Sequence, residues 1–91
     1  MGVDMNTMFD TVRAEALFAS SLQASQKPAP VEVRNAVTGA LRRYGINGCT
    51  ARVAGEFGEH PETAAARMGW ALEMIRSAYQ ELASREFAYA G

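Results

Sequence analysis

The sequence predicts an all-α domain of four helices that ends in a long C-terminal helix. Apolar residues recur every three or four positions, which is the period of one helix face. No segment alternates apolar and polar residues as a half-buried strand does. Proline and glycine stand between the periodic segments, where they begin or end helices. These three observations together favour a helical fold without a sheet.

Composition and length predict one globular domain, residues 1–91. Apolar residues make up 48% of the 91 residues and charged residues 21%, which is ordinary globular usage and not that of a disordered chain. Nine Lys and Arg residues stand against ten Asp and Glu residues, so the net charge of −1 indicates no strongly anionic or cationic partner. No continuous apolar run is long enough to predict a membrane span.

The first predicted helix begins at Asn6 or Thr7 and ends near residue 19, with Asp10 in a capping-box-like relation to Thr7. Its expected apolar face consists of Met5, Phe9, Val12, Ala16 and Ala19, widened by Met8, Leu17 and Leu22. Residues 19–30 are rich in Ser, Gln and Pro, which compete with or break helical hydrogen bonds, and they predict a linker.

The second predicted helix begins near Pro30, whose fixed φ suits a first helical turn. Its expected buried face consists of Val33, Val37, Ala40, Leu41 and Tyr44. Arg42 and Arg43 lie in its last turn, where cations complement the helix dipole, and Gly45 ends it in a left-handed conformation.

After a turn at residues 45–49, a short third helix is predicted from about Thr50 to Phe57, ending at Gly58. Pro61 and Glu62 then open the fourth helix, which we expect to run to about Phe87. Its two apolar stripes are Met68, Leu72, Ile75, Tyr79 and Leu82, and beside them Trp70, Met74 and Ala78. Either the other three helices of the domain cover both stripes, or a further packing partner covers one of them.

The chemistry-bearing residues are too few for a catalytic or metal site. A structural zinc site needs four ligands, usually Cys or His, and the chain has only Cys49 and His60. We expect Cys49 to be a small buried side chain and His60 to be a helix-entry residue, rather than a nucleophilic pair. The sequence therefore predicts no enzyme, no metal and no cofactor. With one cysteine, no internal disulfide can form, and a cytoplasmic location is expected.

Residues 52–76 carry a resemblance to a known family. Val53 and Ala54 precede the turn residue Gly58 by five and four positions, and a Thr-Arg-Ala-Leu-Arg series follows at Thr63, Arg67, Ala71, Leu72 and Arg76. This pattern resembles the region 4 helix-turn-helix of extracytoplasmic-function sigma factors. The whole chain, through residues 48–71, also resembles small actinobacterial proteins of unassigned function. The resemblance implies that the second to fourth helices form a helix-turn-helix-like unit, across which the first helix packs.

The candidate interaction or DNA surface that follows from this resemblance consists of Glu62, Thr63, Ala65, Ala66, Arg67, Gly69 and Trp70. Recognition helices of the family usually carry basic residues where this chain has Ala65, Ala66 and Gly69. Residues 59–76 also have a net charge of −1. Because DNA binding depends on neutralised phosphates, we favour a non-catalytic protein-interaction or regulatory domain.

Two alternatives stay open at this stage. A DNA-binding transcription regulator would use residues 61–76 as its recognition helix, aided by a candidate phosphate patch of Arg34, Arg42, Arg43 and Arg52. These arginines can equally be solvated or helix-capping side chains. In the favoured interpretation the partner is another protein or a second copy of this chain, with a homodimer forming through the long C-terminal helix.

Overall fold

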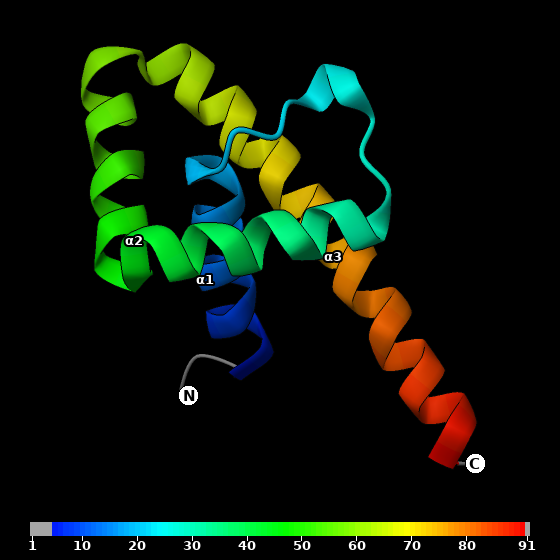
Figure 1. Cartoon of the computed structure of the whole chain (residues 1–91). Coiled ribbons are helices and arrows are strands. Elements are labelled where there is room, and N and C mark those ends of the chain that lie inside the picture. The colour runs from blue at the N-terminus through cyan, green and yellow to red at the C-terminus, as the bar shows by residue number, and fades with distance from the viewer. Residues whose placement is uncertain (1–4, 91) are drawn as a thin grey trace.

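The computed structural model describes the backbone of residues 5–90 and the side chains of residues 8–80. It contains α1 (Met5–Ala19), the short 3₁₀ helix η1 (Ala24–Gln26), α2 (Pro30–Glu59) and α3 (Pro61–Ala90), which are arranged as Figure 1 shows. Residues 5–90 include no strand, so the all-α prediction is confirmed. The long C-terminal helix is confirmed as well.

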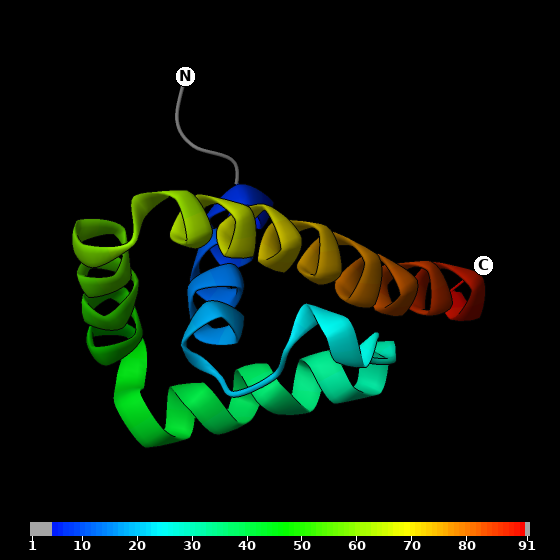
Figure 2. The ribbon, with the colours of Figure 1, turned by 90° about the horizontal axis from the view of Figure 1, so that it is seen from above.

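The prediction of four helices is wrong, because the second and third predicted helices form the single element α2. Only Gly45 departs from helical geometry, at φ 71° and ψ 172°, and the helix resumes at once instead of after a five-residue turn. A conformation of this kind is open essentially only to glycine. Gly45 thus bends α2 into two arms, which Figures 1 and 2 show meeting at a sharp corner.

The helix α1 lies inside this corner, with α3 across its other side (Figure 2). All three helices contribute to one core of fully or nearly fully buried residues: Ala14, Ala16, Leu17, Val33, Val37, Ala40, Cys49, Ala71, Ile75 and Ala78. A smaller cluster of Phe18, Val53 and Ala64 closes the end of the core next to the turn between α2 and α3. The first helix therefore packs across the bent unit that α2 and α3 form.

The buried face of α1 is rotated from the predicted one. Met8 and Phe9 are about half exposed, at 54% and 48%, whereas Ala14 and Phe18 are buried. Because α1 is covered on two sides, its buried face spans adjacent positions and does not follow a single stripe. The Phe9 ring instead lies 5.5 Å from the guanidinium carbon of Arg13.

Residues 20–29, within the predicted linker, lie between α1 and α2 and include one short helical turn at Ala24–Gln26. Its backbone is held locally, since Gln23 N–H donates to Gln26 Oε1 at 2.6 Å and Lys27 adopts a left-handed φ of 48°. Pro30 then occupies the first turn of α2, and Glu32 Oε1 accepts from Ala29 N–H at 2.9 Å. These bonds lead the chain from α1 to the start of α2.

The turn between α2 and α3 is a single residue, His60, with φ −137° and ψ 66°. Val53 is buried beside this turn, whereas Ala54 is exposed and so does not bring α2 and α3 close together. That role falls to Ala64, Ala71 and Ala78, which are at most 3% exposed on α3. Beyond them, the last part of α3 projects past the other two helices in both views (Figures 1 and 2).

Candidate interaction surface

Arg67 points into the fold and not outward from α3. Its Nη2 donates to the carbonyl oxygens of Ser20 and Leu22, both at 2.9 Å, and its Nε donates to that of Phe18 at 3.0 Å. A longer contact of 3.4 Å joins Nη2 to the carbonyl oxygen of Leu17. The carbonyls of Phe18, Ser20 and Leu22 lie at or just beyond the end of α1, where no helical N–H group follows to satisfy them, whereas that of Leu17 also accepts from Ser20. Arg67 therefore caps α1 from a different helix.

Two aromatic rings and a carboxylate complete the surroundings of Arg67. Its guanidinium carbon lies 5.6 Å from the Phe18 ring centroid and 5.2 Å from that of Trp70. Burial lowers the pKa of the Arg67 guanidinium from its ordinary value, and the charge of Glu56 partly offsets that effect. The cation is thus engaged by the fold and is not presented to an external phosphate.

The outward face of the first half of α3 carries the other predicted surface residues. Five of them are exposed, while Trp70 is partly buried beside Arg67. We call the exposed set the outer α3 face: Glu62, Thr63, Ala65, Ala66 and Gly69. A Cβ placed on Gly69 would meet no atom within 4 Å, so the middle of this face is open. Small uncharged side chains lie at its centre.

The charges around the outer α3 face are mainly negative. Glu59, Glu62 and Glu73 are all exposed, and the exposed cation on the same stretch is Arg76. With Arg67 turned inward, the exposed groups of residues 59–76 other than His60 sum to −2, because three carboxylates stand against one guanidinium. This surface repels a polyanion.

The structure does not unite the four arginines of the predicted phosphate patch. Arg34 Nη1 donates to the carbonyl oxygen of Ala78 at 3.0 Å and so ties α2 to α3. Arg42 is exposed. Arg43 and Arg52 are brought together, since their guanidinium carbons lie 5.6 Å and 3.8 Å from the centroid of the same Tyr44 ring.

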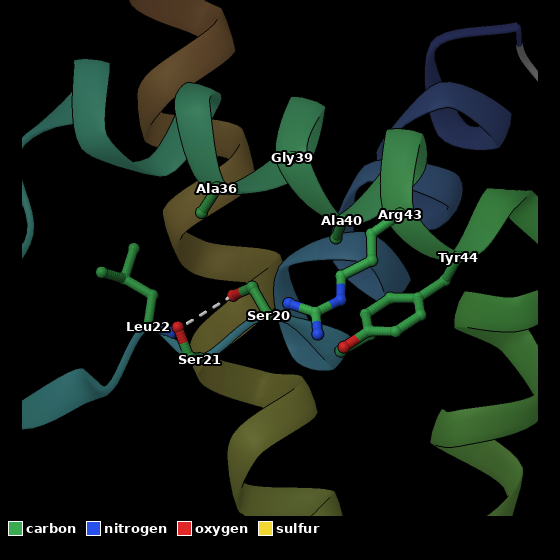
Figure 3. A pocket seen from close by; sticks show the side chains of 9 residues that line it. Ser20, Ser21, Leu22, Ala36, Gly39, Ala40, Arg43 and Tyr44 are labelled. Atoms are coloured by element: carbon green, nitrogen blue, oxygen red, sulfur yellow. Dashed lines mark hydrogen bonds between the residues drawn. The ribbon is translucent and has the colours of Figure 1, made fainter.

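A hollow of about 310 Å³ lies beside Tyr44, between the end of α1 and the first arm of α2. Its lining consists of Ala19, Ser20, Ser21, Leu22, Ala36, Gly39, Ala40, Arg43 and Tyr44, most of which are labelled in Figure 3. A second hollow of about 420 Å³ shares Ala19 and Ser20 and is otherwise lined by Phe18, Gln23, Arg52, Gly55, Glu56, Glu59 and Arg67.

Cys49 and His60 lie in different environments. Cys49 is 1% exposed, its Sγ donates to the carbonyl oxygen of Ala40 at 3.7 Å, and burial raises the pKa of its thiol. His60 is exposed at the turn, with its Nε2 4.0 Å from Glu59 Oε2. Among the described residues, no three His, Cys, Asp or Glu side chains come together as metal ligands.

Comparisons with known proteins return no relative of this chain. No family model matches it, and no match is found among the curated proteins or among the solved structures. Within the described residues, no helix is both long enough and apolar enough to span a membrane. The candidate surfaces are therefore interpreted from their own geometry.

Sequence reasoning missed the inward orientation of Arg67, although one signal for it was present. Arg67 is three residues after Ala64 and four before Ala71, which places it on the same helix face as these two buried alanines. A cation in that register has to find acceptors within the fold. The hollow beside Tyr44 had no such signal, because its lining comes from segments about twenty residues apart.

Proposed function

We propose that this chain is a non-catalytic interaction or regulatory domain that binds another protein through the outer α3 face. Its helices α2 and α3 serve as a helix-turn-helix-like scaffold for that face. The observation that carries the proposal is the orientation of Arg67. Arg67 is the single Lys or Arg residue between residues 53 and 75, and its guanidinium caps the end of α1. What remains exposed is a small-residue centre with carboxylates around it.

The chemistry of this face defines the partner. Ala65, Ala66 and Gly69 leave room for a large apolar side chain, because none of them extends beyond a methyl group. Glu62 lies one turn before Ala66, and Glu73 lies one turn after Gly69. The complementary partner is a protein segment with an apolar side chain between basic residues, since opposite charges steer and orient such contacts.

The same orientation weighs against the alternative of a DNA-binding regulator. A recognition helix gains much of its affinity from cations that neutralise phosphates, and this helix exposes Glu62 and Glu73 instead. Arg43 and Arg52 lie beside Tyr44 on α2, and not on α3, whose residues would read base edges.

The proposal is tested by placing a photo-crosslinking amino acid at Ala66 and irradiating cells of the source organism. The matched control carries the same group at Ala51, which is an exposed alanine on α2. We expect a crosslinked protein with the Ala66 probe, absent with the Ala51 probe and lost when Glu62→Lys and Glu73→Lys are added. A product that both probes give equally would contradict the proposal.

Two further results would redirect it. A crosslinked product with twice the mass of the chain would indicate that the partner is a second copy of this chain. Sedimentation of the purified protein would then be expected to show a dimer, formed through α3. Binding of random duplex DNA by the unmodified protein, falling steeply with salt in fluorescence anisotropy, would favour the transcription regulator instead.

A further inference from the structure

We infer that the hollow beside Tyr44 is a binding site for a small carboxylate attached to an apolar group. This inference is independent of the proposed function, because the hollow is formed by the end of α1 and the first arm of α2, and the outer α3 face lines none of it. Three kinds of observation support it: the polarity of the lining, the free donors and the shape of the floor.

Arg43 is the single charged residue among the nine that line the hollow. In Figure 3 the side chains of Arg43 and Tyr44 extend from α2 toward the linker at Ser20 and Ser21. Arg52 lies 3.8 Å from the centroid of the Tyr44 ring but does not line the hollow, so Arg43 is the one cation of the lining. The local potential is therefore positive, with no carboxylate in the lining to cancel it.

Three of the side-chain donors around the hollow make no hydrogen bond within the described fold. Across the described residues, no hydrogen bond or ion pair engages the Arg43 guanidinium or the hydroxyl groups of Ser21 and Tyr44. Ser20 is different, because its Oγ donates to the Leu17 carbonyl at 2.6 Å and accepts from Leu22 N–H at 3.3 Å. A planar guanidinium beside two hydroxyl donors matches the bidentate geometry of a carboxylate.

The floor of the hollow is apolar and kept open by a glycine. Ala36, Ala40 and Leu22 form it together with Gly39, at which an added Cβ would meet no atom within 4 Å. Gly39 lies within the helical run of α2, where alanine would be more stable by about 0.5–1 kcal/mol. No packing contact requires glycine there, and its effect is to leave space above the helix.

Size and charge select the ligand class. The volume of about 310 Å³ admits a small molecule or the last residue of a peptide, not a folded partner. One lining cation balances the single charge of a carboxylate, whereas a phosphate dianion would leave a charge unpaired. The apolar floor suits a ring or a branched chain attached to that carboxylate.

The test is a titration of the full chain, labelled with ¹⁵N, with two probes followed by amide chemical shifts. Benzoate represents a free acid, and N-acetylphenylalanine represents the carboxyl end of a peptide. Either probe should shift the amides of Ser20, Ser21, Gly39 and Arg43 at millimolar concentrations, and the stronger one identifies the source of the ligand. Benzamide, which has the same ring without the charge, should bind at least tenfold more weakly.

Variants connect the binding to the named residues. Arg43→Gln should weaken binding about ten- to hundredfold, as expected for a lost charge-assisted hydrogen bond. The matched control Arg42→Gln removes a neighbouring exposed arginine outside the lining and should change affinity less than about twofold. Gly39→Leu should abolish binding while the far-ultraviolet circular dichroism spectrum stays helical.

Four results would overturn the inference: no amide shift in the lining with either probe, equal binding of benzamide, equal or tighter binding of inorganic phosphate, or equal loss of affinity in Arg42→Gln and Arg43→Gln. The unfolding of each variant in urea is measured alongside. If Arg43→Gln does not fold, Arg43→Met is used in its place, because methionine keeps an apolar side-chain stem and lacks the guanidinium charge.

Discussion

Replacing Arg67 with alanine should destabilise the protein strongly, even though arginine side chains on helices are often dispensable. The substitution removes three good hydrogen bonds from the guanidinium to the carbonyl oxygens of Phe18, Ser20 and Leu22, at 3.0, 2.9 and 2.9 Å. It also removes the packing of that group against the rings of Phe18 and Trp70. The end of α1 and the start of the linker thus lose these hydrogen bonds to α3.

The expected magnitude is about 3 kcal/mol. A hydrogen bond to a charged group contributes about 1.5–3 kcal/mol net, and three bonds that share one guanidinium are not additive. Arg67 is only partly buried, so water can reach some of the released carbonyls and moderate the loss. A domain of this length has about 5–14 kcal/mol of stability in total, so the loss is a large share of it.

Urea denaturation followed by helical circular dichroism measures the effect, with Arg76→Ala as the control. Arg76 is an exposed arginine on the same helix, and its removal should change the unfolding free energy by less than about 0.5 kcal/mol. Arg67→Lys should lie between the two, because an ammonium group cannot reproduce the planar fork. If Arg67→Ala unfolded at the same urea concentration as Arg76→Ala, the capping role assigned to Arg67 would be refuted.

Three further predictions concern the core, the corner and the thiol. Ile75→Ala should lower the free energy of unfolding in urea by about 2–5 kcal/mol, because Ile75 is 0% exposed. Leu72→Ala should lower it by less, because Leu72 is only partly buried. Equal losses of stability in the two variants would contradict the assigned core. Gly45→Ala should cost about 1–3 kcal/mol in thermal unfolding because φ is 71°, and an unchanged melting temperature would show that the corner can form without glycine. Burial raises the pKa of Cys49, so the folded state keeps its thiol proton to higher pH than the unfolded state does. The free energy of unfolding should therefore fall as pH rises above the ordinary thiol pKa range, and it should fall more steeply in the native protein than in Cys49→Ala. Equal dependence of stability on pH in the two proteins would exclude the thiol as the cause.

Periodicity and punctuation were sufficient to predict the all-α class and most helix ends, but not the number of helices. Pro30 and Pro61 stand at the first positions of α2 and α3, as their fixed φ requires, and residues 20–29 form the linker. The error at Gly45 has a physical cause. A single glycine can redirect a helix without ending it, because the next residue can resume helical angles at once.

The candidate site could be predicted only in part. The exposure of Glu62, Ala65, Ala66 and Gly69 follows from their shared side of α3, opposite its buried alanines. The orientation of Arg67 depended on where α1 ends in space, and the pairing of Arg43 with Arg52 depended on the corner at Gly45. Tertiary placement of this kind leaves no trace in the periodicity of a single helix.

The helix at the centre of the core, α1, precedes α2 and α3 in the chain and is synthesised before them. The buried residues of α1 share their clusters with α3 residues, since Leu17 lies in the core that includes Ala78 and Phe18 lies in the cluster that includes Ala64. At about 5–20 residues per second, the roughly 60 residues between the end of α1 and Ala78 need several seconds to be made. During that interval Leu17 and Phe18 lack their final neighbours, so α1 is the segment of the nascent chain that chaperones and proteases meet unprotected. The core is therefore complete only when the part of α3 up to Ala78 has left the ribosome.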